Sequence, residues 1–215
     1  MTLINIIGLG ITLGEPLFRN LTLAISKGDR IGLVAANGRG KSTLLVCIAG
    51  LIEPNEGGAT CARGLRIGYV TQNVPSAALE ITLFDWVLAA LPAEHAEYES
   101  WRVDVVLDEL QVPYDLQHKL MHELSGGQKA RLAMLALQLK QPNFYLLDEP
   151  TNHFDIEGQE ALERELVEHD TSCVLVSHDR SFLRTVGNRF WWIKGKKLKE
   201  VESPEPFLNG EMGVL

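Results

Sequence analysis

Hydrophobic residues recur along the chain with two different spacings, and each spacing predicts a type of element. Residues 3–7 are apolar except for Asn5, and residues 21–26 place Leu21, Leu23 and Ile25 on one face, which predicts two strands. A continuous apolar run at 31–34 predicts a buried third strand, and a glycine-containing loop follows it. From 41 to 49 the apolar positions take helical spacing, and Gly50 marks the end of that helix.

Further along the chain, strands and helices alternate around a long helical stretch. A strand is predicted at 66–70, and a helical pattern runs from about 80 to 123. The helix at 126–140 is the clearest because its leucines share one stripe before Pro142. The remaining elements are a buried strand at 144–149, a helix at 156–168, a strand at 173–176 and a short strand pair from 191. This order indicates an α/β domain with parallel strands and an inserted helical part.

The composition limits the classes of protein to which the chain can belong. Its 215 residues are 46% hydrophobic and carry a formal charge of −8, the ordinary mix of a folded domain. The negative balance argues against direct binding to duplex DNA. No apolar run approaches the roughly 18 residues of a membrane span, and the N-terminus does not have the features of a signal peptide. We therefore expect a cytoplasmic protein.

The cysteines point to no covalent or metal framework. Cys47, Cys61 and Cys173 are odd in number and share no CxxC spacing, which argues against a disulfide set or a zinc site. Cys47 and Cys173 lie in apolar runs, so we expect them in the core.

The loop before the first helix, AANGRGKS at 35–42, has the residues of a phosphate-binding loop at its working end. Gly38 and Gly40 allow backbone N–H groups to turn toward phosphate oxygens at a helix N-terminus. Lys41 supplies a cation, and the Ser42 hydroxyl can bind Mg²⁺. Ala35 stands where the pattern asks for glycine. The competing interpretation is an ordinary glycine-rich turn with an N-cap serine.

Two acids close the strand at 144–149. Open α/β sheets place ligand sites at the carboxyl ends of their strands, so Asp148 and Glu149 are candidate site residues. Because neighbouring residues of a strand point to opposite faces, we expect different tasks for the two carboxylates. Asp148 would hold Mg²⁺, and Glu149 would polarise the water that attacks the γ-phosphate. An acidic turn before Pro150 is the alternative, but a phosphate loop 107 residues earlier (148 − 41) favours the site.

The start of the 126–140 helix carries a third candidate motif, LSGGQ at 124–128. Ser125 with Gln128 three residues later makes a capping box. A capping box does not explain Gly126 and Gly127, since each glycine costs about 0.5–1 kcal/mol in a helix relative to alanine. Exposed backbone N–H groups at a helix start bind anions, so we expect a second phosphate contact here.

These motifs together resemble the ATP-binding cassette (ABC) ATPases, for which LSGGQ is a highly specific signature. Gln72, after the strand at 66–70, resembles the Q-loop glutamine; Asp155 resembles the D-loop aspartate; and His178 resembles the switch histidine. The resemblance covers residues 3–200, with the phosphate loop as Walker A and 144–149 as Walker B. It implies that Glu149, His178 and Lys41 act in catalysis, that Ser42, Gln72 and Asp148 hold Mg²⁺, and that ATP is bound by Asn37, Gly38, Arg39, Gly40, Lys41, Ser42, Thr43, Gln72, Ser125, Gly126, Gly127, Gln128 and Asp155.

The resemblance also implies an architecture and an assembly. We expect one cassette over 1–215, a P-loop NTPase of the ABC type with a mixed sheet, an antiparallel β edge and an inserted helical subdomain. The core would take about 1–72 and 137–215, and the subdomain about 73–136. In this family two cassettes sandwich ATP between the Walker A loop of one and the signature turn of the other, so residues 125–127 would act on the partner's nucleotide.

Two further stretches resemble the ABC-F group: EPTNHFD at 149–155 and SHDRSFL at 177–183. Members of that group are soluble, many act at the ribosome, and most join two cassettes by a charged helical linker. This chain has one cassette and no linker, so it is either a half that pairs with itself or one half of a longer protein. The family usually stacks adenine on an upstream aromatic residue, and residues 10–14 contain none, so we expect a weakened base preference.

Three functions follow as hypotheses. The first is a soluble ABC-F-like ATPase that works as a cassette dimer and switches a partner, with the ribosome as the candidate. The second is the ATP-binding subunit of a membrane transporter, which would dock a permease. The third is a nucleotide-gated module that scarcely hydrolyses ATP. The motifs at 149–155 and 177–183 favour the first over the second, and the intact catalytic set counts against the third.

Overall fold

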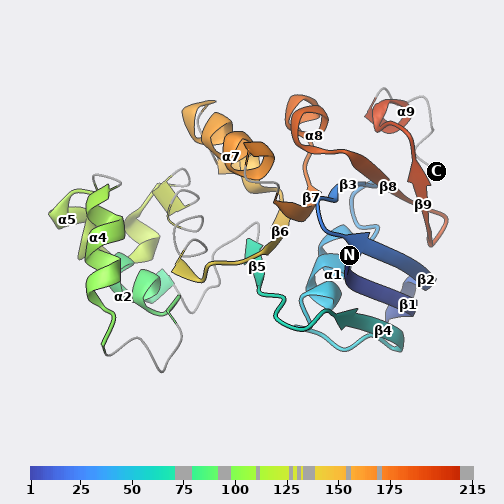
Figure 1. Ribbon diagram of the computed structural model, residues 1–215, viewed down its shortest axis with the longest axis horizontal. Coiled ribbons are helices and arrows are strands. Elements are labelled where there is room, and N and C mark those ends of the chain that lie inside the picture. The colour runs from blue at the N-terminus through green and yellow to red at the C-terminus, as the bar shows by residue number, and fades with distance from the viewer. Residues whose placement is uncertain are drawn as a thin grey trace.

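A computed structural model describes residues 1–70, 79–91, 98–109, 112–125, 128–129, 132, 139–153, 156–168 and 171–208. Figure 1 shows an α/β body at one side of the molecule and a group of short helices at the other. The strands are β1 (Thr2–Leu13), β2 (Glu15–Ser26), β3 (Arg30–Val34), β4 (Glu56–Cys61), β5 (Ile67–Val70), β6 (Phe144–Asp148), β7 (Ser172–Val176), β8 (Arg189–Lys194) and β9 (Lys197–Val201). The helices are α1 (Lys41–Ile48), α2 (Leu83–Leu88), α4 (Trp101–Glu109), α5 (Tyr114–Gln117), α7 (Ile156–Glu168), α8 (Arg180–Val186) and α9 (Glu205–Leu208), with 3-10 turns at Met121–Glu123 and Pro150–His153.

A six-stranded sheet forms the centre of the body, in the order β5-β6-β7-β3-β8-β9. All neighbouring pairs are parallel except β8 and β9, which pair antiparallel at one edge. The strands β6 and β7 are buried at every position because helices or a second sheet cover both faces, as parallel sheets require. The expected mixed sheet with an antiparallel edge is therefore confirmed.

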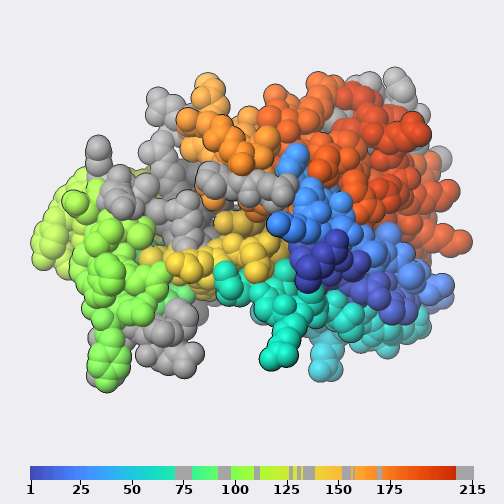
Figure 2. All heavy atoms as spheres, in the orientation of Figure 1, coloured from blue at the N-terminus to red at the C-terminus, as the bar shows by residue number. Residues whose placement is uncertain are grey.

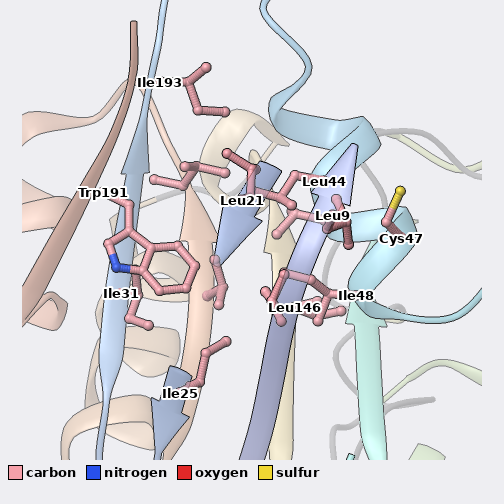
Figure 3. Close-up of a cluster of buried hydrophobic side chains, with 14 of the residues drawn as sticks. Leu9, Leu21, Ile25, Ile31, Leu44, Cys47, Ile48, Leu146, Trp191 and Ile193 are labelled. Carbon is pink, nitrogen blue, oxygen red and sulfur yellow. The ribbon is translucent and has the colours of Figure 1, made fainter. Parts of the chain in front are cut away.

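One face of this sheet packs against α1 and against a three-stranded antiparallel sheet of order β2-β1-β4. Figure 3 shows the resulting core, in which Leu9 and Leu21 of the antiparallel sheet belong to one cluster with Leu44 of α1 and Trp191 of β8. Trp191 is fully buried, and so is Leu146 of β6. The helix α1 is thus fixed to the sheet by the leucines that follow the phosphate loop in sequence.

The antiparallel sheet is larger than the hydrophobic pattern predicted. The strands expected at 3–7 and 21–26 extend over Thr2–Leu13 and Glu15–Ser26, and β4 was not predicted. Several register shifts interrupt the pairing of β1 with β2, so apolar positions lose their strict alternation there. No residue of β4 is fully buried, which removes the hydrophobic signal altogether.

The other face of the six-stranded sheet is covered by α7 and α8. Leu162 and Leu166 of α7 and Phe182 of α8 pack on Leu147 and Leu175 of the sheet. The helix at 156–168 was expected, whereas α8 was not, because its seven residues are too few for a clear periodic pattern. Asp179 caps α8 by accepting a hydrogen bond from the Phe182 backbone N–H at 3.0 Å.

The helices α2, α4 and α5 form a lobe with a hydrophobic cluster of its own, here called the helical lobe (residues 79–91, 98–109 and 112–125). Its core includes Leu83, Val103, Leu107 and Met121. Leu132 and Leu139, from the helix expected at 126–140, pack in the same cluster, and the described residues of that segment are helical up to Leu139. The lobe projects from the body at one end of the molecule (Figure 2). The boundaries at 73 and 136 fall outside the described residues and stay a prediction.

Among the described residues, no helix combines the length and the apolar character needed to cross a membrane. Cys47 and Cys173 are buried in the core, as expected, and Cys61 is exposed on β4. No group of three or more His, Cys, Asp or Glu side chains in the described part of the chain is arranged to hold a metal ion.

Candidate functional site

The strand order brings the predicted motifs to one edge of the sheet. The phosphate loop follows β3, the two acids close β6, and His178 follows β7; these three strands are neighbours in the order β6-β7-β3. Because they are parallel, their carboxyl ends meet at the same edge. Residues separated by more than 100 positions in the sequence are therefore gathered at one place by strand pairing alone.

A pocket of about 480 Å³ lies at this edge. Its volume falls within the range of small-molecule sites. Ten described residues line it: Leu17, Asn37, Gly38, Gly40, Lys41, Ser42, Thr43, Asp148, Glu149 and His178. Nine of them were predicted as site residues from the sequence, while Leu17 of β2 was missed because the strand pattern there was read only from residue 21. Arg39 is exposed and does not line the pocket, so its predicted contact with nucleotide stays a prediction.

Two glycines shape the phosphate loop. Gly38 has φ +73° and Gly40 has φ +89°, a left-handed conformation that side chains with a Cβ rarely adopt. A Cβ on Gly40 would also lie 3.0 Å from Cε1 of Phe18. Gly40 therefore serves both the turn and the close packing of α1 against β2.

The first position of the loop tolerates alanine. Ala35 is not among the residues with positive φ, and its side chain is buried. Its carbonyl accepts a hydrogen bond of 3.0 Å from Nζ of Lys41, and the Asn37 side-chain oxygen lies 3.4 Å from the same Nζ. The departure from glycine at this position therefore leaves the loop conformation intact. Burial lowers the pKa of Lys41, and the negative charges of Glu149 and Asp148 act against that decrease.

Asp148 is a buried carboxylate with an incomplete set of partners. It is only 4% exposed, and its Oδ1 has no hydrogen-bond partner among the described residues. Burial raises the pKa of Asp148, while a hydrogen bond from Ser42 and the positive charge of Lys41 oppose this increase. A buried carboxylate oxygen without a partner, next to a serine hydroxyl, is a set of hard oxygen donors that suits Mg²⁺. The described residues therefore fit the expected metal.

Glu149 does not point away from Asp148, as strand alternation had predicted. Its φ is +53°, so the strand ends at Asp148 and the backbone turns in the left-handed region. The Glu149 backbone N–H donates to the carbonyl of Val176 at 2.9 Å, which fixes the turn to the end of β7. Both carboxylates consequently line the same pocket. The prediction that neighbouring positions face opposite sides is wrong here because Glu149 lies outside the extended strand.

His178 holds the Glu149 carboxylate at two points. The His178 backbone N–H donates to Oε2 of Glu149 at 3.2 Å, and Nε2 of its ring lies 3.2 Å from Oε1. The Glu149 side chain is 7% exposed and the His178 side chain is 57% exposed, so the carboxylate is buried and the imidazole is accessible to solvent. Both residues line the pocket, and the two contacts keep the carboxylate in one orientation.

A second set of polar contacts lies beneath this pair and was not predicted from the sequence. The hydroxyls of Thr151 and Ser177 are 3.2 Å apart, and Oγ of Ser177 accepts a hydrogen bond from the Asp179 backbone N–H at 3.0 Å. The Gln159 side chain, on α7, donates to Oδ2 of Asp179 at 3.1 Å. These contacts join the turn after β6 to the turn after β7, so they support the geometry of Glu149 and His178.

The described residues of the signature segment, Leu124, Ser125 and Gln128, do not line the Lys41 pocket. The Ser125 backbone N–H donates to Oε1 of Gln128 at 2.9 Å, and the Gln128 backbone N–H donates to Oγ of Ser125 at 3.3 Å, which confirms the capping box. Neither Ser125 nor Gln128 lines the pocket of the same chain. The other predicted site residues, namely Gly126, Gly127, Gln72 and Asp155, lie outside the described residues.

Comparison with known proteins places these motifs in a family. Residues 18–152 match the family model described as "ABC transporter". The chain is 35% identical over 187 residues to ATP-binding cassette sub-family F member 3 of Homo sapiens, which covers 86% of this chain and 26% of that protein. It is 36% identical over 189 residues to the ATP-binding protein Uup of Caulobacter vibrioides, covering 87% of this chain and 29% of the relative. The chain therefore spans less than a third of the length of these two relatives.

Solved structures agree on the fold. An ATP-binding cassette described as dimeric, in a post-hydrolysis state and bound to ADP and Pi, superposes with a TM-score of 0.74 at 22% identity, over 93% of this chain and 98% of that one. A transporter structure of a metal-chelate type superposes with a TM-score of 0.75 at 24% identity, over 94% of this chain and 84% of that one. At such identities the likeness concerns the fold alone. With the motifs on three adjacent strand ends and a family model that matches most of the chain, this protein belongs to the ATP-binding cassette (ABC transporter) family and is similar to a single cassette of its sub-family F.

Proposed function

We propose that the chain binds Mg²⁺-ATP and hydrolyses it to ADP and phosphate at the interface of two cassettes, as the ATPase of a soluble, cytoplasmic switch protein of the ABC-F kind. One observation carries the proposal. Lys41, Ser42, Asp148, Glu149 and His178 converge on one pocket, and each offers the chemistry that phosphoryl transfer needs.

The contacts of each residue indicate its role in the reaction. Lys41 reaches the pocket from the first turn of α1 and supplies positive charge for the β- and γ-phosphates. Glu149 accepts a proton from the water that attacks the γ-phosphorus, while the bond to the leaving oxygen of ADP breaks. His178 keeps the Glu149 carboxylate oriented through its backbone N–H, and its exposed ring lies on the ligand side of the pocket.

Asp148 and Ser42 would hold the magnesium ion. When bound, Mg²⁺ neutralises negative charge on the phosphate oxygens in the transition state. The unpartnered Oδ1 of Asp148 is the buried acceptor that such a cation would satisfy. We expect Gln72 to be the third residue that holds the ion, and it lies outside the described residues.

The partner cassette enters the proposal through the signature turn. Ser125 is exposed and does not line the chain's own pocket. A phosphate site on this segment would therefore serve the nucleotide of a second cassette. That cassette is either another copy of this chain or the other half of a longer protein.

Glu149→Gln tests catalysis and assembly together. The amide keeps the shape of the carboxylate but cannot accept the proton, so ATP should bind while phosphate release falls by at least about 100-fold, the lower range for a general base. Because ATP bridges two cassettes, the variant should be monomeric without nucleotide and dimeric with Mg²⁺-ATP. Glu160→Gln, at an exposed position of α7, removes the same charge and should retain wild-type turnover.

Ser125→Arg added to Glu149→Gln separates binding from assembly. The arginine would fill the site offered to the partner's phosphate. Light scattering should therefore detect a monomer in the presence of Mg²⁺-ATP, while ATP stays bound at Lys41. A dimer of equal mass in all samples would place the association on another surface. A monomer in all samples would mean that this chain pairs with a different cassette.

The cellular role is proposed from the likeness to sub-family F and from the motifs at 149–155 and 177–183. We propose the ribosome as the partner. The transporter alternative has one observation in its favour, the family description "ABC transporter". Fractionation of cells that express a tagged full chain decides between them: recovery with ribosomes supports the switch protein, and recovery with membranes supports the transporter subunit.

A further inference from the structure

Four lysines lie within six residues at the end of the chain's last hairpin. Lys194 closes β8, Lys196 lies in the turn with φ +64°, and Lys197 and Lys199 belong to β9. All four side chains are exposed. A local charge of +4 in a chain of net charge −8 is a concentrated exception to the overall acidity.

Strand register places three of these lysines on one face of the hairpin. Lys194 lies directly opposite Lys197, and Trp192 lies opposite Lys199. Cross-strand partners share a face, so Trp192, Lys194, Lys197 and Lys199 form one surface, here called the basic face. Trp191 and Ile193 point to the opposite side, into the core. The basic face therefore continues the sheet surface beyond α8.

The charges of the basic face are not neutralised within the protein. None of its three lysines, nor Lys196, forms an ion pair in the described part of the chain. Glu200, the acid next to Lys199, is bound by Arg189 at 2.7 and 2.9 Å. Arg19 of β2 is also exposed and lies beside the turn, because its backbone N–H donates to the Lys196 carbonyl at 3.1 Å.

A structural explanation accounts for only part of this arrangement. The strand β9 is an edge strand, and lysines on edge strands discourage pairing with other chains. That explains Lys197 and Lys199. It does not explain Lys194, which lies on the inner strand of the hairpin, because like charges directly opposite each other destabilise a strand pair. A self-repelling cluster that forms no ion pair among the described residues and that folding does not need indicates a ligand with negative charges.

We propose that the basic face binds the phosphate backbone of RNA. Regular, exposed cations on a rigid surface match a polyanion whose charges also repeat. A lipid surface fits less well, because interfacial binding needs apolar side chains that insert, and the aromatic residue of this face, Trp192, is half-buried with Lys194 Nζ 4.7 Å from its ring centre. The β8–β9 hairpin lies at the end of the molecule opposite the helical lobe (Figures 1 and 2), so it could contact RNA without covering that lobe.

This inference deepens the proposed role at the ribosome, and its test is independent of ATP hydrolysis. Fluorescence anisotropy of a labelled 20-nucleotide single-stranded RNA would be measured with the full chain, without nucleotide, from 50 to 200 mM salt. With four phosphate contacts, one from each lysine of the basic face and one from Lys196, the affinity should fall about 50-fold over this range. Each contact to a single strand contributes about 0.7 to the slope of log affinity against log salt. Replacing Lys194, Lys197 and Lys199 by glutamine leaves one contact, and the decrease should shrink to about 3-fold.

The matched control replaces three other exposed lysines, Lys27, Lys119 and Lys140, by glutamine, which changes the net charge equally. It should keep the wild-type salt slope. Circular dichroism of the first variant should show an unchanged fold, because the substitution removes the repulsion between Lys194 and Lys197. Equal losses in both variants, an RNA affinity that does not depend on the basic face, or binding only to vesicles of anionic phospholipid would each overturn the proposal. ATP turnover in the same samples reports on the proposed catalysis separately.

Discussion

Replacing Asp148 by asparagine should stabilise the nucleotide-free fold at neutral pH while removing Mg²⁺-dependent turnover. The Asp148 carboxylate is 4% exposed, and its Oδ1 is buried without a partner among the described residues. Leaving a buried polar group unpaired costs about 1–3 kcal/mol, and more when the group is charged. Asparagine has the same shape without the charge. The oxygen stays unpaired in the variant, so only the additional cost of burying a charge is removed, and we expect a gain of about 1 kcal/mol in free energy of unfolding at pH 7.

The pKa shift of Asp148 determines at which pH the two proteins should differ in stability. Burial raises the pKa of Asp148 above its ordinary value of 3.8, so folding favours the protonated form. The wild-type protein keeps the contribution of this group below pH 3.8 and loses it as the pH rises through the folded-state pKa. The advantage of Asp148→Asn should accordingly be small near pH 4 and reach its full size at neutral pH.

Urea unfolding of both proteins at several pH values between 4 and 8, without magnesium or nucleotide, measures this difference directly. The slope against urea should be the same for both, so that the midpoints report stability. An asparagine variant that is less stable than wild type at pH 7 would refute the reasoning, because the hydrogen bond from Ser42 and the charge of Lys41 would then outweigh the cost of burial. A stability difference that does not change with pH would refute it as well.

Three further outcomes are expected. Lys41→Ala should abolish ATP turnover and weaken nucleotide binding, and near-wild-type phosphate release would show that the phosphate loop has been misassigned. Gly40→Ala should lower the thermal stability more than Gly64→Ala. Both positions have positive φ, where an alanine costs about 1–2 kcal/mol. Only the Cβ at position 40 would also press on a neighbouring side chain, since nothing lies within 4 Å of a Cβ at Gly64. Equal losses would contradict that contact. Gln159→Ala should lower kcat up to about 10-fold with an unchanged KM for ATP, since it removes a hydrogen bond of about 0.5–1.5 kcal/mol from the Asp179 carboxylate, which follows the proposed catalytic residue His178. A lower Tm with unchanged kcat would limit Gln159 to a structural role.

The chemistry of the site could be predicted from the sequence because it is carried by short, contiguous motifs. A glycine-rich loop between a buried strand and a helix has few structural solutions, so the sequence could predict Gly38 in the loop and Lys41 and Ser42 at the start of α1. The capping box of Ser125 and Gln128 was predicted for the same reason, since its partners are three residues apart. Interactions of this range depend on local backbone geometry and little else.

Elements whose hydrophobic signal is weak were missed or shortened. The strand β4 is held by backbone pairing with β1 and has no fully buried side chain, so no periodic pattern marks it. The register shifts between β1 and β2 interrupt the alternation of apolar and polar positions, which weakens the pattern there as well. The strand β4 is stabilised by pairing with β1, which lies far away in the sequence, and a local pattern does not record such pairing.

The arrangement of the proposed catalytic groups was decided by the tertiary structure alone. Alternation along β6 would separate Asp148 from Glu149, yet the bond from the Glu149 backbone to Val176 belongs to a turn with positive φ that brings both carboxylates into one pocket. The support of Asp179 by Gln159 arises in the same way, from the packing of α7 beside α8. The sequence alone determined which chemical groups the protein carries and which local turns present them. Their distances depend on how β6, β7 and β3 pair, because contacts between residues far apart in the chain form only when the whole sheet has formed.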